Sequence, residues 1–363
     1  MRAFHATRVF DGTRWHEDAA LVVEEGRVAR IARDVPGAER VAGWILPGLV
    51  DLQVNGGGGV LFNNDPSAQG LACIRAAHAR LGTTGMMVTL ITDTPEVVAR
   101  AVEAAASSDV MGLHLEGPHF AMARKGTHDG ALIRPMEEVD LRALEAAAGR
   151  VRLLCTLAPE VVGVEAIRRL VAAGAVVSLG HSDATDAEAL AAAAAGARMV
   201  THLFNAMSPL SHRAPGLVGA ALDDERFCAG IIADGFHVED AVLRIALRAA
   251  PERIFLVSDA MSTVGTDLPG FTLNGREILR QGGRLTLADG TLAGADIALI
   301  DAVRHVVGLG VGLEEAWGMG SSLPAAAMED ASRGGLREGQ RADFVAVDEG
   351  LGLCGVWIGG VAV

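Results

Sequence analysis

Eight apolar, β-like runs alternate with Ala/Leu/Arg/Glu segments of helical period through the middle of the chain. The runs lie near residues 45–54, 84–91, 109–116, 151–157, 175–181, 198–204, 228–234 and 254–259. Regular alternation of strand and helix indicates repeated βα units, whose strands pair in parallel. Eight such units predict an α/β chain closed into a (β/α)8 TIM barrel, and 363 residues leave room for one smaller domain.

The two ends of the chain have a different pattern. Residues 1–44 and 335–363 contain short runs of alternating apolar and polar residues, separated in the first segment by the turn pairs Asp11-Gly12 and Glu25-Gly26. We therefore predict that both ends pair into one small β-sandwich domain beside a barrel of residues 45–334. Turn pairs such as Asn274-Gly275 predict a β-hairpin inserted in the barrel at about 270–292.

Composition and charge exclude several classes of protein. No apolar run is long enough to span a bilayer, and Met1–His5 lack the features of a signal peptide. The four cysteines are scattered without a CxxC pair, which favours reduced thiols and a cytoplasmic location. A net charge of −14 would repel nucleic acid, so an anionic substrate would need local basic residues.

Polar side chains occur where the predicted strands end, which is where TIM-barrel enzymes place their catalytic groups. These residues are Gln53 and Asn55 after the first strand, Glu116 at the third, His181 at the fifth, His202 at the sixth, Asp234 and His237 at the seventh, and Asp259 at the eighth.

One carboxylate and two imidazoles, Glu116, His181 and His202, form the ligand set of a catalytic Zn²⁺ site with an open fourth position. A single histidine near a strand is more often structural, but three ligands at one end of a barrel favour a metal site. His114 shares the strand face of Glu116 one layer deeper, which indicates core. Asp259 is placed to act as general base and then acid; its structural alternative is a helix N-cap.

The chain is similar over nearly its whole length to the N-acetylglucosamine-6-phosphate deacetylases of the amidohydrolase superfamily. Seven motifs carry the resemblance: Leu46–Gly56, Gly112–Pro118, Lys125–His128, Gly180–Ser182, Thr201–Met207, Ala233–His237 and Ser258–Ala260. The resemblance implies hydrolysis of the acetamide of N-acetylglucosamine 6-phosphate, in amino-sugar catabolism, with Glu116, His181 and His202 as metal ligands and Asp259 as acid/base.

The same resemblance implies how the substrate is held. Contacts to the sugar phosphate are implied for Thr127, His128, Asp234 and His237, for Asn205 and the Ala206 backbone near the phosphate, and for Leu292, Ala293 and Gly294, which close over the sugar. It also implies a homodimer in which Arg213 reaches the phosphate of the neighbouring subunit's substrate. Arginine suits this task because its guanidinium binds a phosphate through two hydrogen bonds.

The sequence favours one divalent metal per chain. Gln53 and Asn55 stand where many amidohydrolases have His-x-His, and neutral amides are poor Zn²⁺ ligands, so they would bind a water or a weak second metal. The only lysine, Lys125, does not fall in the fourth strand, which excludes a bridging carbamylated lysine. We expect Zn²⁺, with Fe²⁺ as the alternative.

Three other functions remain open at this point. A deacetylase for N-acetylgalactosamine 6-phosphate would carry almost the same motifs, because the two sugars differ only at C4. A noncatalytic barrel used for binding is disfavoured because all four candidate catalytic residues are present. An amidohydrolase for a nucleobase or cyclic amide is disfavoured by the phosphate-side residues Asn205 and Arg213.

Overall fold

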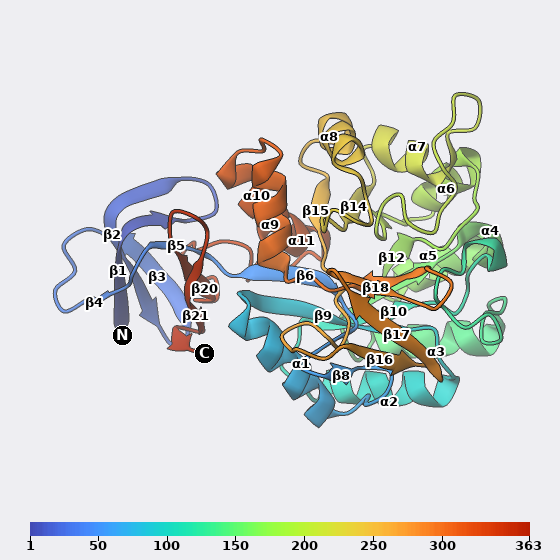
Figure 1. Cartoon of the computed structure of the whole chain (residues 1–363), viewed down its shortest axis with the longest axis horizontal. Helices are drawn as coiled ribbons and strands as arrows, with labels where there is room; N and C mark the ends of the chain where they lie inside the picture. The colour runs from blue at the N-terminus through green and yellow to red at the C-terminus, as the bar shows by residue number, and fades with distance from the viewer.

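A computed structural model describes residues 1–363. Its centre is a parallel eight-stranded sheet whose strands follow one another in chain order (Figure 1). The strands are β6 (Leu49–Val54), β9 (Thr83–Ile91), β10 (Gly112–Glu116), β11 (Leu153–Leu157), β12 (Val176–Leu179), β13 (Met199–Val200), β14 (Cys228–Ile231) and β15 (Ile254–Leu256). A bridge between Val54 and Ala260 joins the two ends of the sheet. The predicted α/β barrel fold is confirmed.

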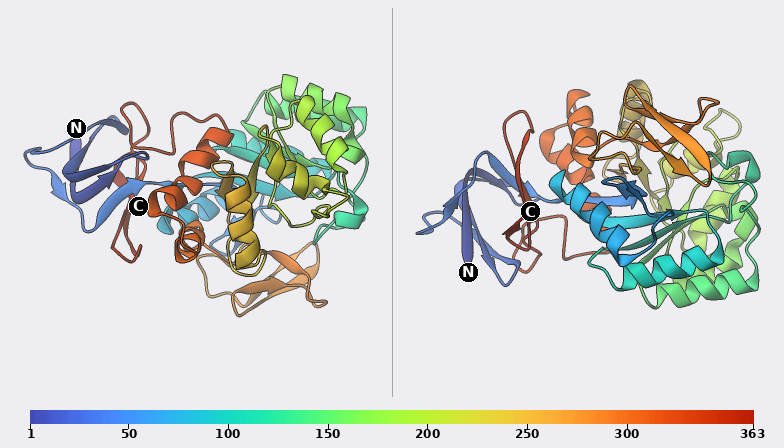
Figure 2. Two further views of the ribbon diagram at one scale, coloured as in Figure 1. Left: turned by 90° about the horizontal axis from the view of Figure 1, so that it is seen from above. Right: turned by 60° about the horizontal axis from the view of Figure 1, so that its bottom comes forward.

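Helices cover the outside of the barrel (Figure 2). They are α1 (Ala68–Arg80), α2 (Pro95–Ala106), the 3-10 turn η1 (Met122–Arg124), α3 (Glu138–Ala148), α4 (Pro159–Val162), α5 (Val164–Ala172), α6 (Asp186–Ala194), α7 (Gly216–Asp223), α8 (Asp240–Ala249), α9 (Leu299–Gly308), α10 (Leu313–Met319) and α11 (Ser322–Ala327). Strand side chains alternate between two cores: Leu153 and Cys155 pack outward against helices, whereas Leu154 packs inside the barrel.

The two chain ends form one sheet at one side of the barrel (Figure 1). Its strands are β1 (Arg2–Phe10), β2 (Trp15–Glu24), β3 (Arg27–Ala32), β4 (Glu39–Arg40), β5 (Trp44–Pro47), β20 (Phe344–Val347), β21 (Leu353–Ile358) and β22 (Val361–Ala362). The sheet curls until Ala342 N donates to Gly26 O at 2.9 Å. It thereby encloses a separate core that contains Phe4, Phe344 and Trp357, which is the expected sandwich.

All of the predicted barrel strands except 84–91 are shorter in the structure, and two of them differ most from the prediction. The run 45–54 divides at Gly48, because β5 pairs with β1 and β20 in the end sheet whereas β6 pairs with β9 in the barrel. The end sheet thus includes residues up to Pro47. We propose the same three-part division of the chain, with the boundary between the first part and the barrel moved from residue 44 to residue 47. The run 198–204 pairs only over Met199–Val200, because His202 and Phe204 have φ angles of 31° and 78°, which extended strands do not adopt.

The segment predicted as a hairpin forms a four-stranded antiparallel sheet, which we call the insert sheet. It contains β16 (Gly270–Leu273), β17 (Arg276–Gln281), β18 (Arg284–Thr286) and β19 (Leu292–Ala295). A small two-stranded sheet, β7 (Gly56–Gly57) with β8 (Val60–Leu61), follows β6. None of the helices has both the length and the apolar character needed to cross a membrane.

Candidate active site

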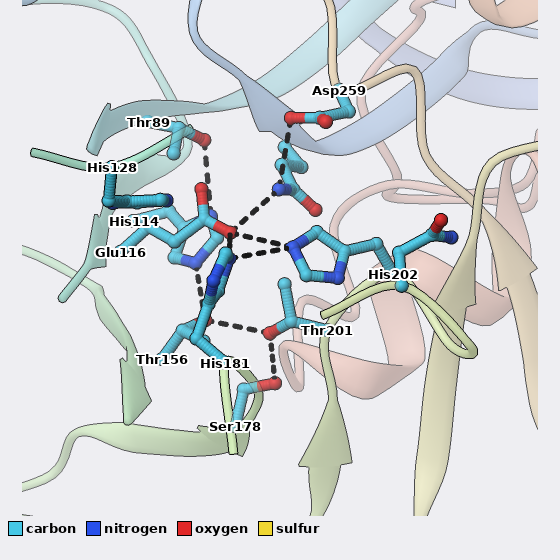
Figure 3. A network of polar contacts seen from close by, with 12 residues as sticks. Thr89, His114, Glu116, His128, Thr156, Ser178, His181, Thr201, His202 and Asp259 are labelled. Atoms are coloured by element: carbon cyan, nitrogen blue, oxygen red, sulfur yellow. Dashed lines mark hydrogen bonds and ion pairs between the residues drawn. The ribbon is translucent and has the colours of Figure 1, made fainter. Parts of the chain in front are cut away.

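The predicted metal and acid/base residues lie together at the carboxyl ends of the barrel strands (Figure 3). Glu116 is the last residue of β10, and His181, His202 and Asp259 lie in the turns that follow β12, β13 and β15. The latter three have φ angles of 48°, 31° and 50°. Left-handed backbone is costly for residues other than glycine and concentrates at functional sites, so these turns hold the side chains in place at the expense of local strain.

Glu116 is the centre of the cluster. Its Oε1 lies 2.9 Å from Nε2 of His202 and 3.3 Å from Nε2 of His181, and the two imidazole nitrogens are 3.1 Å apart. All three side chains are buried. Burial tends to raise the pKa of Glu116, but the hydrogen bonds and charges of the two histidines hold this pKa well below its usual value. Glu116 is therefore an anion.

The cluster fits a divalent cation. Nδ1 of His181 contacts the Arg124 carbonyl at 2.9 Å, a bond in which the ring nitrogen must donate. Nε2 of His181 is then a lone-pair acceptor that faces the carboxylate of Glu116. Fixing one ring nitrogen so that the other binds metal is the usual outer contact of a ligand histidine.

A third imidazole approaches the same point. His128 has a ring nitrogen within 4.8 Å of the ligand atoms of Glu116 and His181. Its Nδ1 is held by the Thr92 hydroxyl at 2.8 Å, and no hydrogen bond joins it to Glu116. We therefore keep His202 in the proposed ligand set and assign His128 to the substrate side. Thr92 follows β9, which with β11 is one of the two barrel strands at whose ends the sequence pattern singled out no residue.

Gln53 and Asn55 hold Asp259. Nε2 of Gln53 lies 3.2 Å from Glu116 Oε1 and 3.1 Å from Asp259 Oδ1, and Nδ2 of Asn55 lies 2.7 Å from the same Oδ1. These amides thus donate to carboxylates through their nitrogens, and their contact with a water or a weak second metal stays a prediction. Burial, reinforced by the negative charge of Glu116, raises the pKa of Asp259 to about 6.

A cavity of about 230 Å³ opens in front of these residues. Seven of the residues that were predicted to contact substrate line it: Thr127, His128, Asn205, Ala206, His237, Leu292 and Gly294. The sequence did not single out four further lining residues, Ile91, Ile232, Met261 and Thr291, because apolar or loop residues of this kind give no local signal. The insert sheet contributes Leu292 and Gly294 of β19, and Thr291 directly precedes this strand, so the insert sheet forms one wall of the cavity.

Three residues predicted to contact substrate do not line the cavity. Asp234 Oδ2 instead lies 2.7 Å from Nδ1 of His237 and orients that ring. Ala293 is fully buried behind Leu292 and Gly294. Arg213 is exposed in a loop before α7, outside the cavity of its own chain. His114 is buried below Glu116, as the period of β10 predicted, and contacts Thr89 and Thr156 (Figure 3).

A closed parallel barrel with one carboxylate and two imidazoles at its C-terminal mouth defines the class of metal-dependent barrel hydrolases. The chain belongs to the amidohydrolase family, whose model matches residues 44–363. It is 39% identical to an N-acetylgalactosamine-6-phosphate deacetylase of Shewanella sp. (strain ANA-3), covering 95% of this chain and 91% of that protein. It is 37% identical to a human N-acetylglucosamine-6-phosphate deacetylase, covering 97% and 90%.

The likeness extends to three-dimensional structure. The crystal structure of N-acetylglucosamine-6-phosphate deacetylase from Pasteurella multocida superposes with a TM-score of 0.96 at 32% identity, covering 100% of this chain and 99% of that one. The predicted family is thereby confirmed.

Proposed function

We propose that the protein hydrolyses the acetamide of N-acetyl-D-glucosamine 6-phosphate to D-glucosamine 6-phosphate and acetate. The observation that carries this proposal is Asp259, a carboxylate held by two amides against the Glu116–His181–His202 cluster in one cavity. Relatives over nearly the full length that are named for this reaction support it. All four candidate catalytic residues are present and line one cavity, so the noncatalytic alternative has no support.

Glu116, His181 and His202 would hold one divalent ion, which supplies Lewis-acid activation of water and of the amide carbonyl. Asp259 carries the proton. Its Oδ1 accepts from Gln53 and Asn55, whereas Oδ2 has no protein donor and faces the reaction. Oδ2 takes the proton of the attacking water and returns it to the departing amine, and a pKa near neutrality suits both steps.

The substrate contacts follow from the cavity lining. His237, oriented by Asp234, and His128, oriented by Thr92, present ring nitrogens toward the sugar amide. Asn205 and Ala206 also line the cavity, and we assign Asn205 and the Ala206 backbone to the phosphate. We further propose a homodimer in which Arg213 supplies the missing phosphate cation across the subunit boundary, Zn²⁺ as the metal, and a cytoplasmic location.

The N-acetylgalactosamine 6-phosphate alternative differs only in the direction of one hydroxyl, and curated relatives of both names match the chain. The test is to incubate metal-reconstituted protein with each of the two sugar phosphates and to analyse the products. Unphosphorylated N-acetylglucosamine serves as the control. We expect kcat/KM to be highest for the gluco substrate. A higher value for the galacto substrate would reverse the assignment, and inactivity on both would revive the cyclic-amide alternative.

A further inference from the structure

The two proposed histidine ligands differ in their outer contacts. Nδ1 of His181 is bonded to the Arg124 carbonyl, but Nδ1 of His202 is buried and has no hydrogen-bond partner in the protein. His202 as a whole is 5% exposed. A buried N–H without a hydrogen-bond partner lowers the stability of the folded protein by about 1–3 kcal/mol. A hydrogen-bond acceptor next to Nδ1 of His202 would remove this cost. In Figure 3 it points away from Glu116, to the side of Thr201.

A small cavity lies on that side of His202, inside the barrel. Its volume is about 10 Å³, close to the space that one water molecule needs. Most of its wall is apolar, including Leu52, Phe255 and Val257, but polar side chains also line it. These polar residues are Gln53, His114, Ser178, Thr201 and His202. A cavity of this size with several polar partners holds water, whereas a purely apolar one stays dry.

A chain of buried hydrogen bonds ends at the same cavity (Figure 3). Val54 N donates to Thr89 Oγ1 at 3.0 Å, and Thr89 Oγ1 contacts Nδ1 of His114 at 3.1 Å. The chain continues from His114 Nε2 through Thr156 and Thr201 to Ser178, with contacts of 2.7, 2.7 and 2.6 Å.

The direction of this chain follows from its first bond. Val54 N is itself a donor, so His114 Nδ1 is the one acceptor that the protein offers to the buried hydroxyl proton of Thr89, and Thr89 donates to it. A neutral imidazole then donates from Nε2, and each hydroxyl donates to the next. The last proton is that of Ser178, which has no acceptor in the protein beyond the chain. Two buried donors, His202 Nδ1–H and Ser178 O–H, thus border one cavity of the size of a water molecule.

We infer that one structural water occupies this cavity and accepts hydrogen bonds from Nδ1 of His202 and from the hydroxyl of Ser178. The water does for His202 what the Arg124 carbonyl does for His181. It keeps the proton on Nδ1, so that Nε2 presents a lone pair toward Glu116. Ser178 is then a positioning residue, which acts on the metal site through the water and His202 without touching substrate.

Two measurements test the inference, which rests on the proposed ligand role of His202. A high-resolution crystal structure of the wild-type protein should show an ordered water within hydrogen-bonding distance of His202 Nδ1 and Ser178 Oγ. In addition, Ser178→Ala should raise the Zn²⁺ dissociation constant, measured by competition with a chromogenic chelator, about tenfold, at the lower end of the effects of such outer contacts.

Thr83→Val is the matched control, because it also removes a buried strand hydroxyl, but one that has no partner and lies at the start of β9, away from the site. Zn²⁺ affinity of this variant should equal that of the wild type. An empty cavity in the density, or equal Zn²⁺ affinities of Ser178→Ala and Thr83→Val, would overturn the inference. Wild-type protein that binds no Zn²⁺ would instead refute the proposed function, and the density would still decide on the water.

Discussion

The side-chain amide of Asn55 lies 2.7 Å from Oδ1 of Asp259, and this contact spans the seam at which the barrel closes. Asn55 follows the first barrel strand, and Asp259 follows the last. Two backbone hydrogen bonds lie beside the contact between Asn55 and Asp259: Asn55 N and Gly56 N both donate to Ala260 O, at 2.9 and 3.0 Å. The contacts that close the barrel therefore also orient the proposed acid/base, Asp259.

The role of Asp259 can be tested with Asp259→Asn. The substitution keeps the size of the side chain but removes its basicity, so turnover should fall by roughly two to four powers of ten. Metal content, measured by elemental analysis, should stay at the wild-type level, because the carboxylate is outside the proposed ligand set. Near-normal turnover of the variant would exclude Asp259 from the mechanism.

Metal stoichiometry is a second prediction. Gln53 and Asn55 direct N–H groups at Glu116 and Asp259, and neutral amides are poorer Zn²⁺ ligands than the imidazoles that many amidohydrolases have at these positions. We expect about one tightly bound divalent ion per chain, and complete loss of activity after chelation, with recovery on adding Zn²⁺. Two ions per chain that survive extensive dialysis would contradict this prediction.

The barrel and the cluster at its mouth could be predicted from sequence because both follow from local pattern. Strand and helix periods fixed the eight βα units, and barrel geometry then brought Glu116, His181 and His202 together although they are distant in the chain. The roles of Gln53 and Asp234 could not be predicted in the same way. Whether an amide faces a metal, a water or a carboxylate depends on rotamers and neighbours from other strands, which no single segment encodes.

Irregular backbone was the second feature of the fold that could not be predicted from the sequence. The short pairing of β13 results from the left-handed residues His202 and Phe204, and nothing in the composition of 198–204 signals them. The insert sheet was recognised only through its turn pairs. The Asn274-Gly275 turn between β16 and β17 occurs as predicted, whereas the pairing of β18 with β19 shifts register between Arg284 and Thr286, and such bulges leave no clear sequence pattern.

The junction between barrel and end sheet gives a stability prediction. Asp343, which is 6% exposed, accepts from Arg333 at 2.7 Å and from Arg341 at 2.8 Å. Asp343→Ala leaves Arg341 unpaired and the largely buried Arg333 with only a 3.4 Å contact to Asp330, and should lower the free energy of unfolding by about 3–5 kcal/mol in chemical denaturation. The control is Glu103→Ala, which breaks an exposed pair with Arg150 and should cost about 0–1 kcal/mol. Equal effects would show that the buried cluster does not stabilise the junction.

Arg213 tests substrate recognition and assembly together. The cavity of one chain has no arginine in its lining, and Arg213 lies exposed outside it, which is why we propose that its phosphate contact is made to the substrate of another subunit. Arg213→Ala should lower kcat/KM for the 6-phosphorylated sugar roughly ten- to a hundredfold, the equivalent of about 1.5–3 kcal/mol for a charge-assisted bond. Activity on unphosphorylated N-acetylglucosamine should hardly change. Arg248→Ala, at another exposed arginine on α8, should alter neither.

Mixing two impaired variants separates the cross-subunit contact from an effect within one chain. In the proposed dimer, Arg213 and Asp259 of the same active site come from different chains, so a heterodimer of Arg213→Ala and Asp259→Asn protein would contain one site with both defects and one site with neither. Partial activity should therefore return when subunits exchange, and exchange itself is followed with differently tagged chains. If exchange occurs and the mixture is no more active than the sum of its parts, Arg213 acts within its own subunit and the proposed dimer site is wrong.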